Sequence, residues 1–223
     1  MLTLKGVTKF YGGLRARQVL RDVSLALASG ELIAIMGESG VGKSTLLNLI
    51  AGLDVPDAGT VVFDAVEVNA LDDTARTLLR RKRMGFVFQA IHLLPHLTVL
   101  QNVRLPLDLA GVAHRTAEQR TLAMLDAVGI ASLARDYPRT LSGGEAQRAA
   151  IARALVHAPT LVLADEPTGN LDQASASQVL TLLREQIRQR SSGGILVTHS
   201  HAAARIADRV YVLTQDGLTA TSV

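Results

Sequence analysis

The stretch GESGVGKS, residues 37–44, decides how the rest of the chain is interpreted. It follows the apolar run ELIAIMG, which predicts a buried strand, and leads into KSTLLNLIAGL, whose leucines recur at helical spacing. Glycines in such a turn let successive backbone N–H groups converge at the start of a helix, where the helix dipole favours an anion. The order of strand, glycine-rich loop and helix therefore predicts a phosphate-binding site.

The loop matches the pattern G-x-x-x-x-G-K-[ST] in full, which in this setting is typical of a P-loop that binds a nucleoside triphosphate such as ATP. We expect the Lys43 ammonium group to reach the terminal phosphates and the Ser44 hydroxyl to bind Mg²⁺. A glycine turn with only a structural role is the weaker alternative, because the complete motif stands in the required context. The nucleotide-binding residues predicted from this stretch are Gly37, Glu38, Ser39, Gly40, Val41, Gly42, Lys43, Ser44 and Thr45.

The composition excludes several kinds of protein. The 223 residues contain no cysteine, so disulfides, thiolate metal sites and cysteine nucleophiles are excluded. Aromatic residues make up 3% of the chain, which disfavours stacking on single-stranded nucleic acid. No run approaches the roughly 20 apolar residues of a membrane span, so we expect one soluble, intracellular domain with a sizeable core. The basic run RTLLRRKR, residues 76–83, is more simply a solvated helix face than a site for lipid headgroups or phosphate.

Short apolar runs alternate with helical patterns and predict an α/β fold with a parallel sheet. They occupy residues 31–37, 84–89, 160–167, 193–200 and 209–213. Between Leu93 and Arg139 the pattern is mostly helical, with TAEQ at residues 116–119 as a capping box and Gly129 as a stop signal. We therefore expect a helical lobe inserted between strands. A last long helix is predicted over residues 173–190.

Two carboxylates follow the buried strand in TLVLADEPTGNLD, residues 160–172. Ligands of parallel sheets bind at the carboxyl ends of strands, so Asp165 and Glu166 lie where the nucleotide is expected. We expect Asp165 to hold Mg²⁺ through water. Glu166 is the expected base for the attacking water, since ATP hydrolysis chiefly requires positioning and charge stabilisation around an in-line nucleophile. The alternative is a pair of carboxylates that cap the following turn.

Gln89 and His199 are polar residues at the ends of two other predicted strands. Either side chain could contact the γ-phosphate or the attacking water. A single Gln or His at a strand end is more often a satisfied structural residue, so each signal is weak alone. Their interest lies in their occurrence together with the P-loop and Glu166.

The segment LSGGEAQR, residues 141–148, is a second glycine-rich loop before a helix. Ser142 and Glu145 fit a capping box, which would explain the loop as a helix start alone. A cap does not need Gly143 and Gly144, however, and each glycine costs about 1 kcal/mol of helix propensity. Both expose backbone N–H groups beside the Ser142 hydroxyl, so the loop is predicted to bind a phosphate.

These motifs, in this order, resemble those of the ATP-binding-cassette (ABC) ATPases over essentially the whole chain. The resemblance implies a P-loop NTPase fold with a RecA-like core, an antiparallel β subdomain and a helical subdomain inserted near residues 90–150 of a single domain that spans 1–223. It implies ATP and Mg²⁺ as cofactors and a head-to-tail homodimer on ATP binding. In that dimer Ser142, Gly143, Gly144 and Glu145 of one subunit close over the ATP held by the other subunit's P-loop.

The same resemblance implies roles for single residues. Tyr11 is similar to the aromatic residue that stacks on adenine, and the GNLD loop at residues 169–172 resembles the loop that crosses the dimer interface. Gln89 resembles the residue that senses Mg²⁺ and the γ-phosphate, and His199 the switch histidine that polarises the γ-phosphate. The expected catalytic residues are then Glu166, His199, Lys43 and Gln89, and the expected metal-binding residues are Ser44, Gln89 and Asp165.

Within the family the chain resembles the short cassettes of the lipoprotein-releasing, macrolide-exporting and cell-division-associated group, on FVFQ, LTVLQNVRLPL, LSGGE and ADEPTGNLD. This resemblance implies a cytoplasmic protein, peripheral on the inner face of the cell membrane, and no nucleic-acid partner. A coupling helix of an integral membrane permease subunit would dock between Gln89 and Leu107. In two departures, Glu145 stands where most of the family has Gln, and Ser200 follows His199 where an acidic residue is usual.

Other functions are disfavoured on specific grounds. A soluble ABC ATPase of translation or DNA repair typically carries two cassettes in one chain, or a long coiled-coil or zinc insertion, and no such feature occurs here. A small-molecule P-loop kinase or a GTPase would leave LSGGEAQR unexplained, and the N-K-x-D motif is missing. A module that only binds ATP is disfavoured by the intact Glu166 and His199.

Overall fold

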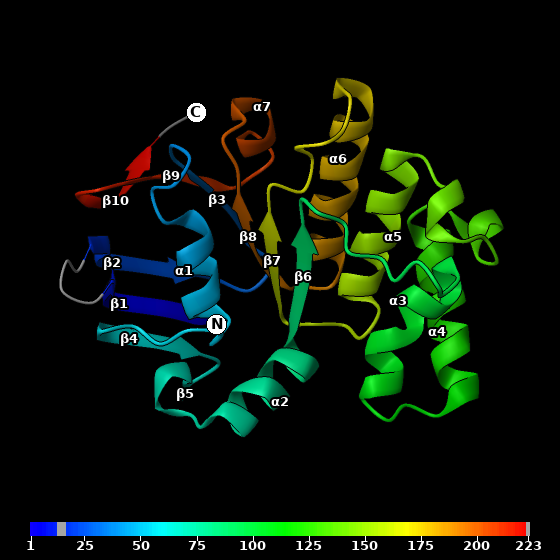
Figure 1. Cartoon of the computed structure of the whole chain (residues 1–223), viewed down its shortest axis with the longest axis horizontal. Helices are drawn as coiled ribbons and strands as arrows, with labels where there is room; N and C mark the ends of the chain where they lie inside the picture. Colours follow the sequence, from blue (N-terminus) through cyan, green and yellow to red (C-terminus); the bar gives the residue numbers. More distant parts are fainter. Residues whose placement is uncertain (13–16, 222–223) are drawn as a thin grey trace.

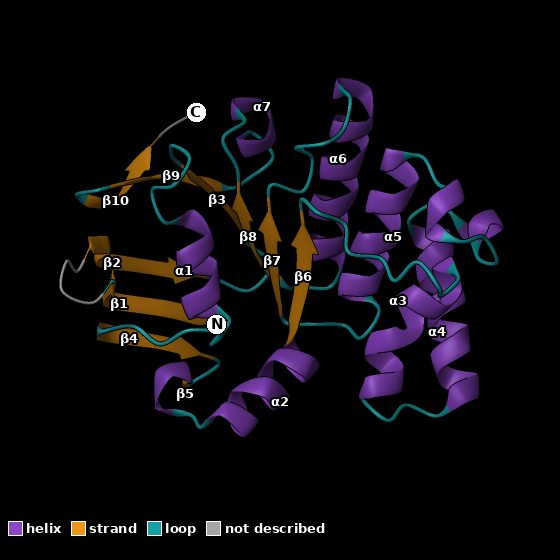
Figure 2. Ribbon diagram, in the orientation of Figure 1, coloured by secondary structure: helices purple, strands orange, loops and turns teal. Residues whose placement is uncertain are grey.

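A computed structural model describes residues 1–12 and 17–221. Within these residues the strands form a four-stranded antiparallel sheet and a six-stranded sheet (Figure 1, Figure 2). The first consists, in order, of β2 (Arg17–Leu27), β1 (Leu2–Tyr11), β4 (Ala58–Phe63) and β5 (Val66–Glu67). The second consists, in order, of β10 (Gly217–Thr221), β9 (Arg209–Thr214), β3 (Leu32–Met36), β8 (Gly193–Val197), β7 (Leu161–Asp165) and β6 (Met84–Phe88).

The second sheet confirms the predicted parallel core. β3 pairs in parallel with β8 and β9, and β7 pairs in parallel with β6 and β8. All residues of β3 and β8 are buried, as expected for strands covered on both faces. The register places Phe88 beside Asp165 and Asp165 beside Val197, so the carboxyl ends of β6, β7 and β8 reach the same edge. The sequence does not predict β10, which adds an antiparallel edge strand beside β9.

The helices connect these strands. They are α1 (Lys43–Ile50), α2 (Asp73–Arg83), α3 (Val99–Leu109), α4 (His114–Ala127), α5 (Gly143–Leu155), α6 (Gln173–Gln189) and α7 (His201–Ala204). Short 3₁₀ turns cover Val68–Ala70, Ala131–Leu133 and Pro138–Thr140. α1 ends just before Gly52, whose φ of 63° is the left-handed conformation that commonly follows a helix.

The parallel strands separate the two larger apolar cores of the described residues. Alternate residues of β7 enter different cores, because successive side chains of a strand point to opposite faces: Leu161 and Leu163 enter one, Val162 and Ala164 the other. The first core also contains residues of α1 and of the antiparallel sheet, and the second contains residues of α3, α4, α5 and α6. In Figure 1 the antiparallel sheet and the pair α3 and α4 accordingly lie on opposite sides of the parallel strands. The carboxyl edge therefore rests on a framework packed from both sides.

Two details of the helices bear on the sequence predictions. The capping box predicted at residues 116–119 is wrong: α4 begins at His114, its N-cap is Ala113, and no side chain caps it. A capping box is present instead at Thr98 and Gln101, at the start of α3. The basic run of α2 has no buried residue, which confirms the interpretation as a solvated face.

Asp208 joins the end of α6 to the start of β3. Its Oδ2 accepts a hydrogen bond from the Leu32 backbone N–H at 2.9 Å, and its Oδ1 accepts one from Arg188 at 2.9 Å. Asp208→Ala would leave the Leu32 N–H without its acceptor, so we expect the free energy of unfolding to fall by about 1–3 kcal/mol at pH 7. Urea unfolding measures this. Asp216→Ala, which removes a loose, exposed pair with Arg21, is the control and should change stability by less than about 1 kcal/mol.

The same contacts predict a pH dependence. Burial alone would raise the pKa of Asp208, but the hydrogen bonds from Leu32 and Arg188 outweigh it and hold the pKa below its ordinary value. A carboxyl with a lowered pKa stabilises the fold above the unfolded pKa of about 4 and loses this contribution as the pH falls through the folded pKa. The stability difference between the native chain and Asp208→Ala should therefore persist at pH 5 and shrink below about pH 4. A difference that is already lost at pH 5 would contradict this assignment.

Candidate functional site

The carboxyl ends of the parallel strands border a cavity of about 850 Å³. Gln89 follows β6, Asp165 ends β7 with Glu166 directly after it, and His199 follows β8 after one intervening residue. The parallel register thus delivers the predicted residues to one place. The residues that line the cavity are Tyr11, Arg17, Val19, Ser39, Gly40, Gly42, Lys43, Ser44, Thr45, Phe88, Gln89, Ala90, His92, Asp165, Glu166 and His199. Arg17 and Val19, on β2, are lining residues that no sequence motif indicates.

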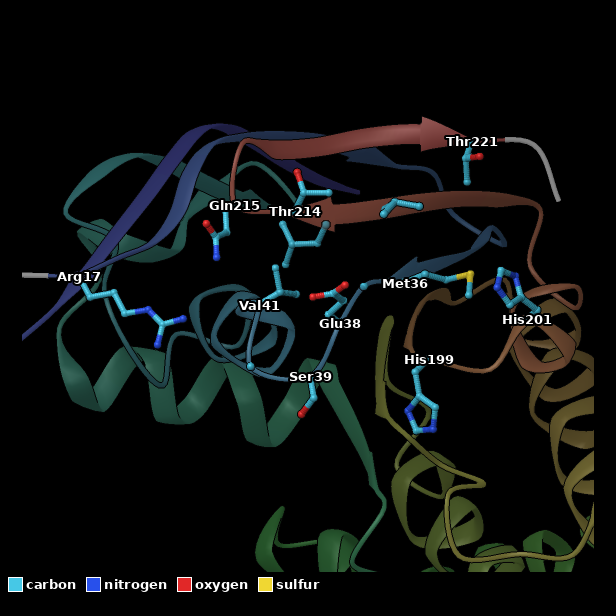
Figure 3. Close-up of a pocket in the computed structure, with 14 residues that line it drawn as sticks. Arg17, Met36, Glu38, Ser39, Val41, His199, His201, Thr214, Gln215 and Thr221 are labelled. Atoms are coloured by element: carbon cyan, nitrogen blue, oxygen red, sulfur yellow. The ribbon is translucent and has the colours of Figure 1, made fainter.

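The phosphate loop divides between two adjoining cavities. Ser39, Gly40 and the residues from Gly42 to Thr45 line the first, whereas Gly37, Glu38 and Val41 line only a neighbouring cavity of about 740 Å³, beside Thr214 and Gln215 (Figure 3). Side chains of the loop thus face both ways, which the linear motif does not reveal.

The loop is built around glycine and a buried lysine. Gly42 has a φ of 114°, and a Cβ there would lie 2.9 Å from the Val19 Cγ1 and 3.0 Å from the Val19 carbonyl oxygen. Another residue would be strained and would clash at the start of α1. The Lys43 Nζ donates hydrogen bonds of 2.8 Å to the carbonyl oxygens of Gly37 and Glu38, which hold the ammonium group within the curve of the loop. Backbone donors at a helix start and a buried cation suit a polyphosphate.

Ser44 and Asp165 meet across the cavity. The Ser44 hydroxyl donates to Asp165 Oδ2 at 2.9 Å. Burial raises the pKa of Asp165, as does the nearby charge of Glu166, while the hydrogen bond from Ser44 and the charge of Lys43 act in the opposite direction. A hydroxyl and a carboxylate oxygen beside the phosphate loop are hard donors of the kind that bind Mg²⁺ together with phosphate oxygens and water. The residues therefore fit the expected metal.

Glu166 turns away from Asp165 and contacts the segment after β8. Its Oε1 accepts a hydrogen bond from the His199 backbone N–H at 3.0 Å and lies 2.7 Å from His199 Nδ1. Its Oε2 accepts from the Thr198 hydroxyl at 3.2 Å. The backbone at Glu166 has a φ of 46°, in the left-handed region that few non-glycine residues adopt. The two adjacent carboxylates thus have different partners, and Thr198 is a further contact that no motif predicted.

Ser200, which stands where an acidic residue is expected after His199, forms local hydrogen bonds in the segment that Glu166 contacts. The Ser200 hydroxyl accepts from the Ala203 backbone N–H at 3.3 Å and so caps α7. The Ser200 backbone N–H donates to the Thr198 hydroxyl at 3.0 Å. Serine is an effective N-cap, so it can replace the usual acidic residue as a local acceptor. The His199 side chain itself is 69% exposed.

Gln89 contacts the loop after β7. Its Nε2 donates to Asn170 Oδ1 at 3.4 Å, and Asn170 Nδ2 donates to the Gln89 carbonyl oxygen at 3.3 Å. Residues of α5 hold the segment that follows: Arg153 donates to the carbonyl oxygens of Ile91 and His92 at 2.9 Å and 2.7 Å. Sequence motifs do not indicate this role of Arg153, since its partners are backbone atoms distant in the chain.

The second glycine-rich loop has the predicted capping box but lies elsewhere. The Glu145 backbone N–H donates to the Ser142 hydroxyl at 3.3 Å, and the Ser142 backbone N–H donates to Glu145 Oε2 at 2.8 Å. Gly143 and Gly144 form the first turn of α5. Among the described residues, none that lines the 850 Å³ cavity belongs to this loop. The loop therefore does not contribute to the phosphate site of its own chain.

Comparison with known proteins identifies the family. A family model described as ABC transporter matches residues 20–169. The chain belongs to the ABC transporter family. The ABC chain is 46% identical, over 95% of its length and 93% of the relative's, to the lipoprotein-releasing system ATP-binding protein LolD of Legionella pneumophila (strain Paris). It is 47% identical, over 88% and 86% of the two chains, to LolD of Saccharophagus degradans.

Solved structures show the same fold for this ABC cassette. A dimeric structure of MJ0796, a bacterial ABC transporter cassette, superposes with a TM-score of 0.88 at 39% identity and covers 98% of this chain and 96% of that one. A dimeric post-hydrolysis state of MJ0796 bound to ADP and Pi gives a TM-score of 0.90 at 38% identity, over 100% and 98%. The α/β fold is the ABC ATPase fold, and the chain is an ATP-binding ATPase cassette.

The family assignment decides among the alternatives. Similarity to transporter subunits over nearly the whole chain disfavours a soluble cassette of translation or DNA repair, and it excludes a small-molecule kinase or a GTPase. No helix in residues 1–12 and 17–221 is long and apolar enough to cross a membrane.

Proposed function

We propose that this ABC cassette closes as a head-to-tail homodimer on ATP binding and drives a separate membrane subunit. The observation that carries the proposal is the separation of the two phosphate-binding loops: the P-loop lines the cavity, and the loop from Ser142 to Glu145 does not. A second copy would bring that loop over the nucleotide. The dimeric MJ0796 cassettes support this arrangement.

At each nucleotide, different residues of the cavity would bind the phosphates, hold Mg²⁺ and activate the attacking water. Lys43 and the backbone donors of the P-loop bind the phosphates, and Ser44, Asp165 and Gln89 would hold Mg²⁺, which neutralises the charge on the phosphate oxygens. Glu166 would accept the proton of the attacking water. Its three contacts with Thr198 and His199 fix the carboxylate, so that the base is oriented when the nucleotide arrives.

The chain would act as one domain whose helical part, about residues 90–150, passes the motion to the membrane subunit. We place the docking site of a coupling helix between Gln89 and Leu107. Leu94 is 45% exposed and Phe88 39% exposed, so apolar surface is available at its start. Arg153 connects this surface to α5, whose N-cap and first turn are formed by Ser142 to Glu145. Movement of α5 on dimer closure would therefore reach the docked helix.

By the same reasoning the protein would lie on the cytoplasmic face of the cell membrane, held there by its partner. The LolD relatives favour lipoprotein release as the process that it drives. Macrolide export and transmission of force across the membrane are the other activities that the resemblance allows, because one cassette fold serves all three.

The test is to identify the partner. The Glu166→Gln variant, purified with ATP and Mg²⁺ from detergent-solubilised host membranes, should retain a polytopic subunit with a large extracytoplasmic domain. Adding Leu94→Glu should release that subunit by placing a charge on the docking surface, while ATP binding by the isolated cassette remains. Recovery of ribosomes or DNA-repair proteins, with no membrane subunit, would contradict the proposal.

A further inference from the structure

Three polar side chains, those of Tyr11, Lys9 and Asp54, meet at a point where Tyr11 lines the nucleotide cavity. The Tyr11 hydroxyl donates a hydrogen bond of 2.5 Å to Asp54 Oδ2. The Lys9 ammonium group donates to Asp54 Oδ1 at 2.9 Å and to the Val55 carbonyl oxygen at 2.7 Å. Asp54 itself lies just beyond the end of α1, in a turn that no nucleotide motif of the sequence includes. One carboxylate thus joins the end of β1 to the helix that begins at the P-loop.

Lys9 and Tyr11 also contact each other directly. The Lys9 Nζ stands over the Tyr11 ring, 5.1 Å from its centroid. Lys9 is 8% exposed, whereas Tyr11 is 43% exposed and lines the 850 Å³ cavity. The Lys9 cation covers one face of the Tyr11 ring and leaves the opposite face for a ligand. From its own face, Lys9 draws electron density from the ring. A flat purine can stack on that remaining face.

The protonation states of Tyr11, Lys9 and Asp54 keep the hydrogen bonds of the cluster intact near neutral pH. The hydrogen bond to Asp54 raises the pKa of Tyr11, so its hydroxyl stays protonated as a donor. Burial would lower the pKa of Lys9, but the hydrogen bond and charge of Asp54 outweigh it and raise the pKa overall. Burial would likewise raise the pKa of Asp54, but the hydrogen bonds from Tyr11 and Lys9 lower it. The cluster is therefore an ionised pair with a neutral phenol attached.

A ring that is already fixed favours ligand binding, because a mobile side chain must lose conformational freedom when the ligand binds. An exposed tyrosine on an edge would lose rotamer freedom on stacking, which lowers ligand affinity. In this structure the hydroxyl is already fixed by Asp54, at the end of the ring distant from the backbone. The conformational entropy of the Tyr11 side chain is therefore lost when the protein folds, and not when adenine binds.

We propose that Asp54 is a positioning residue that, together with Lys9, fixes the Tyr11 ring so that adenine stacks on its face opposite Lys9. The proposal rests on the proposed binding of ATP in this cavity and on the role of Tyr11 as the platform for adenine, which the family resemblance implies. Stacking alone would require only the Tyr11 ring. The proposal also requires that the Tyr11 hydroxyl contributes to ATP affinity.

The experiment compares two ligands by calorimetry: ATP, and inorganic tripolyphosphate, which offers phosphates without a base, each with Mg²⁺. Tyr11→Ala tests the platform and should weaken ATP binding on the order of tenfold with tripolyphosphate unchanged. If Tyr11→Ala leaves ATP binding intact, the platform role fails and this proposal fails with it. If Tyr11→Ala weakens ATP binding and Tyr11→Phe does not, only the positioning role is overturned.

Tyr11→Phe and Asp54→Ala should each weaken ATP binding between about two- and tenfold, with tripolyphosphate unchanged. Both substitutions remove the same hydrogen bond. The ATP affinity of the double variant should therefore be no lower than that of the single variant with the lower affinity. Asp57→Asn is the matched control: Asp57 accepts from the Phe10 backbone N–H, an interaction that asparagine can keep, and its ATP affinity should be native. Equal weakening of both ligands by Asp54→Ala would show a merely structural role and overturn the proposal, and Tyr11→Phe tests it independently should Asp54→Ala fail to fold.

Discussion

Replacement of Glu166 by Gln is expected to lower the rate of ATP hydrolysis by about 10²–10⁴-fold, the usual contribution of a general base. Gln keeps the shape of the side chain and can still accept a hydrogen bond from the His199 backbone N–H, as Glu166 Oε1 does. It cannot take a proton from the attacking water. ATP binding should remain, because the phosphates are bound by the P-loop. Phosphate release, measured with excess ATP, gives the turnover.

The same variant should accumulate as an ATP-bound dimer, because the step that reopens the dimer is blocked. Size-exclusion chromatography with and without ATP measures this directly. Glu118→Gln, an equivalent change on the exposed part of α4, is the control and should retain native turnover. Full turnover of Glu166→Gln would remove Glu166 from the role of base.

Ser142→Arg should reduce turnover by about 10²-fold, comparable with the loss of a donor that stabilises transition-state charge. The reason is steric as well as chemical: Ser142 is exposed, and a long charged side chain there would enter the interface that must close over the nucleotide of the second subunit. ATP should still bind to the monomer, because this loop does not line its own chain's cavity. ATP-dependent dimerisation of the Glu166→Gln variant, with and without Ser142→Arg, is the measurement.

The control for Ser142→Arg must separate loss of the helix cap from loss of dimer closure. Ser142 caps α5 through a capping box, and its removal costs about 1 kcal/mol of stability. Thr98 caps α3 in the same way, so Thr98→Arg removes an equivalent cap away from the phosphate loops. Thr98→Arg should therefore be destabilised to a similar degree and still dimerise with ATP. If Ser142→Arg also dimerises with ATP, the loop does not act on the second subunit.

Sequence reasoning was accurate where one physical signal dominated. Buried parallel strands require continuous apolar runs, so β3, β6, β7, β8 and β9 were all predicted. Boundaries set by weak local signals were less certain. A Thr and a Gln three residues apart occur at both 98–101 and 116–119, and only the first pair stands where the chain leaves extended geometry. The sequence does not predict β10, because an edge strand can contain few apolar residues. The last three residues of β10, TAT, resemble a polar chain terminus.

The sequence by itself determined the phosphate loop, the two carboxylates after β7, the capping box at Ser142 and the family to which they belong. These features depend on neighbours in the chain: backbone geometry at glycine, helix capping and strand burial act over a few residues. Only the tertiary structure decided which side chains meet. Asp165 turns to Ser44 while Glu166 turns to His199, and Asp54 reaches the Tyr11 hydroxyl across 43 positions of sequence. Such pairs depend on the register of strands and the packing of two cores, which no local pattern encodes.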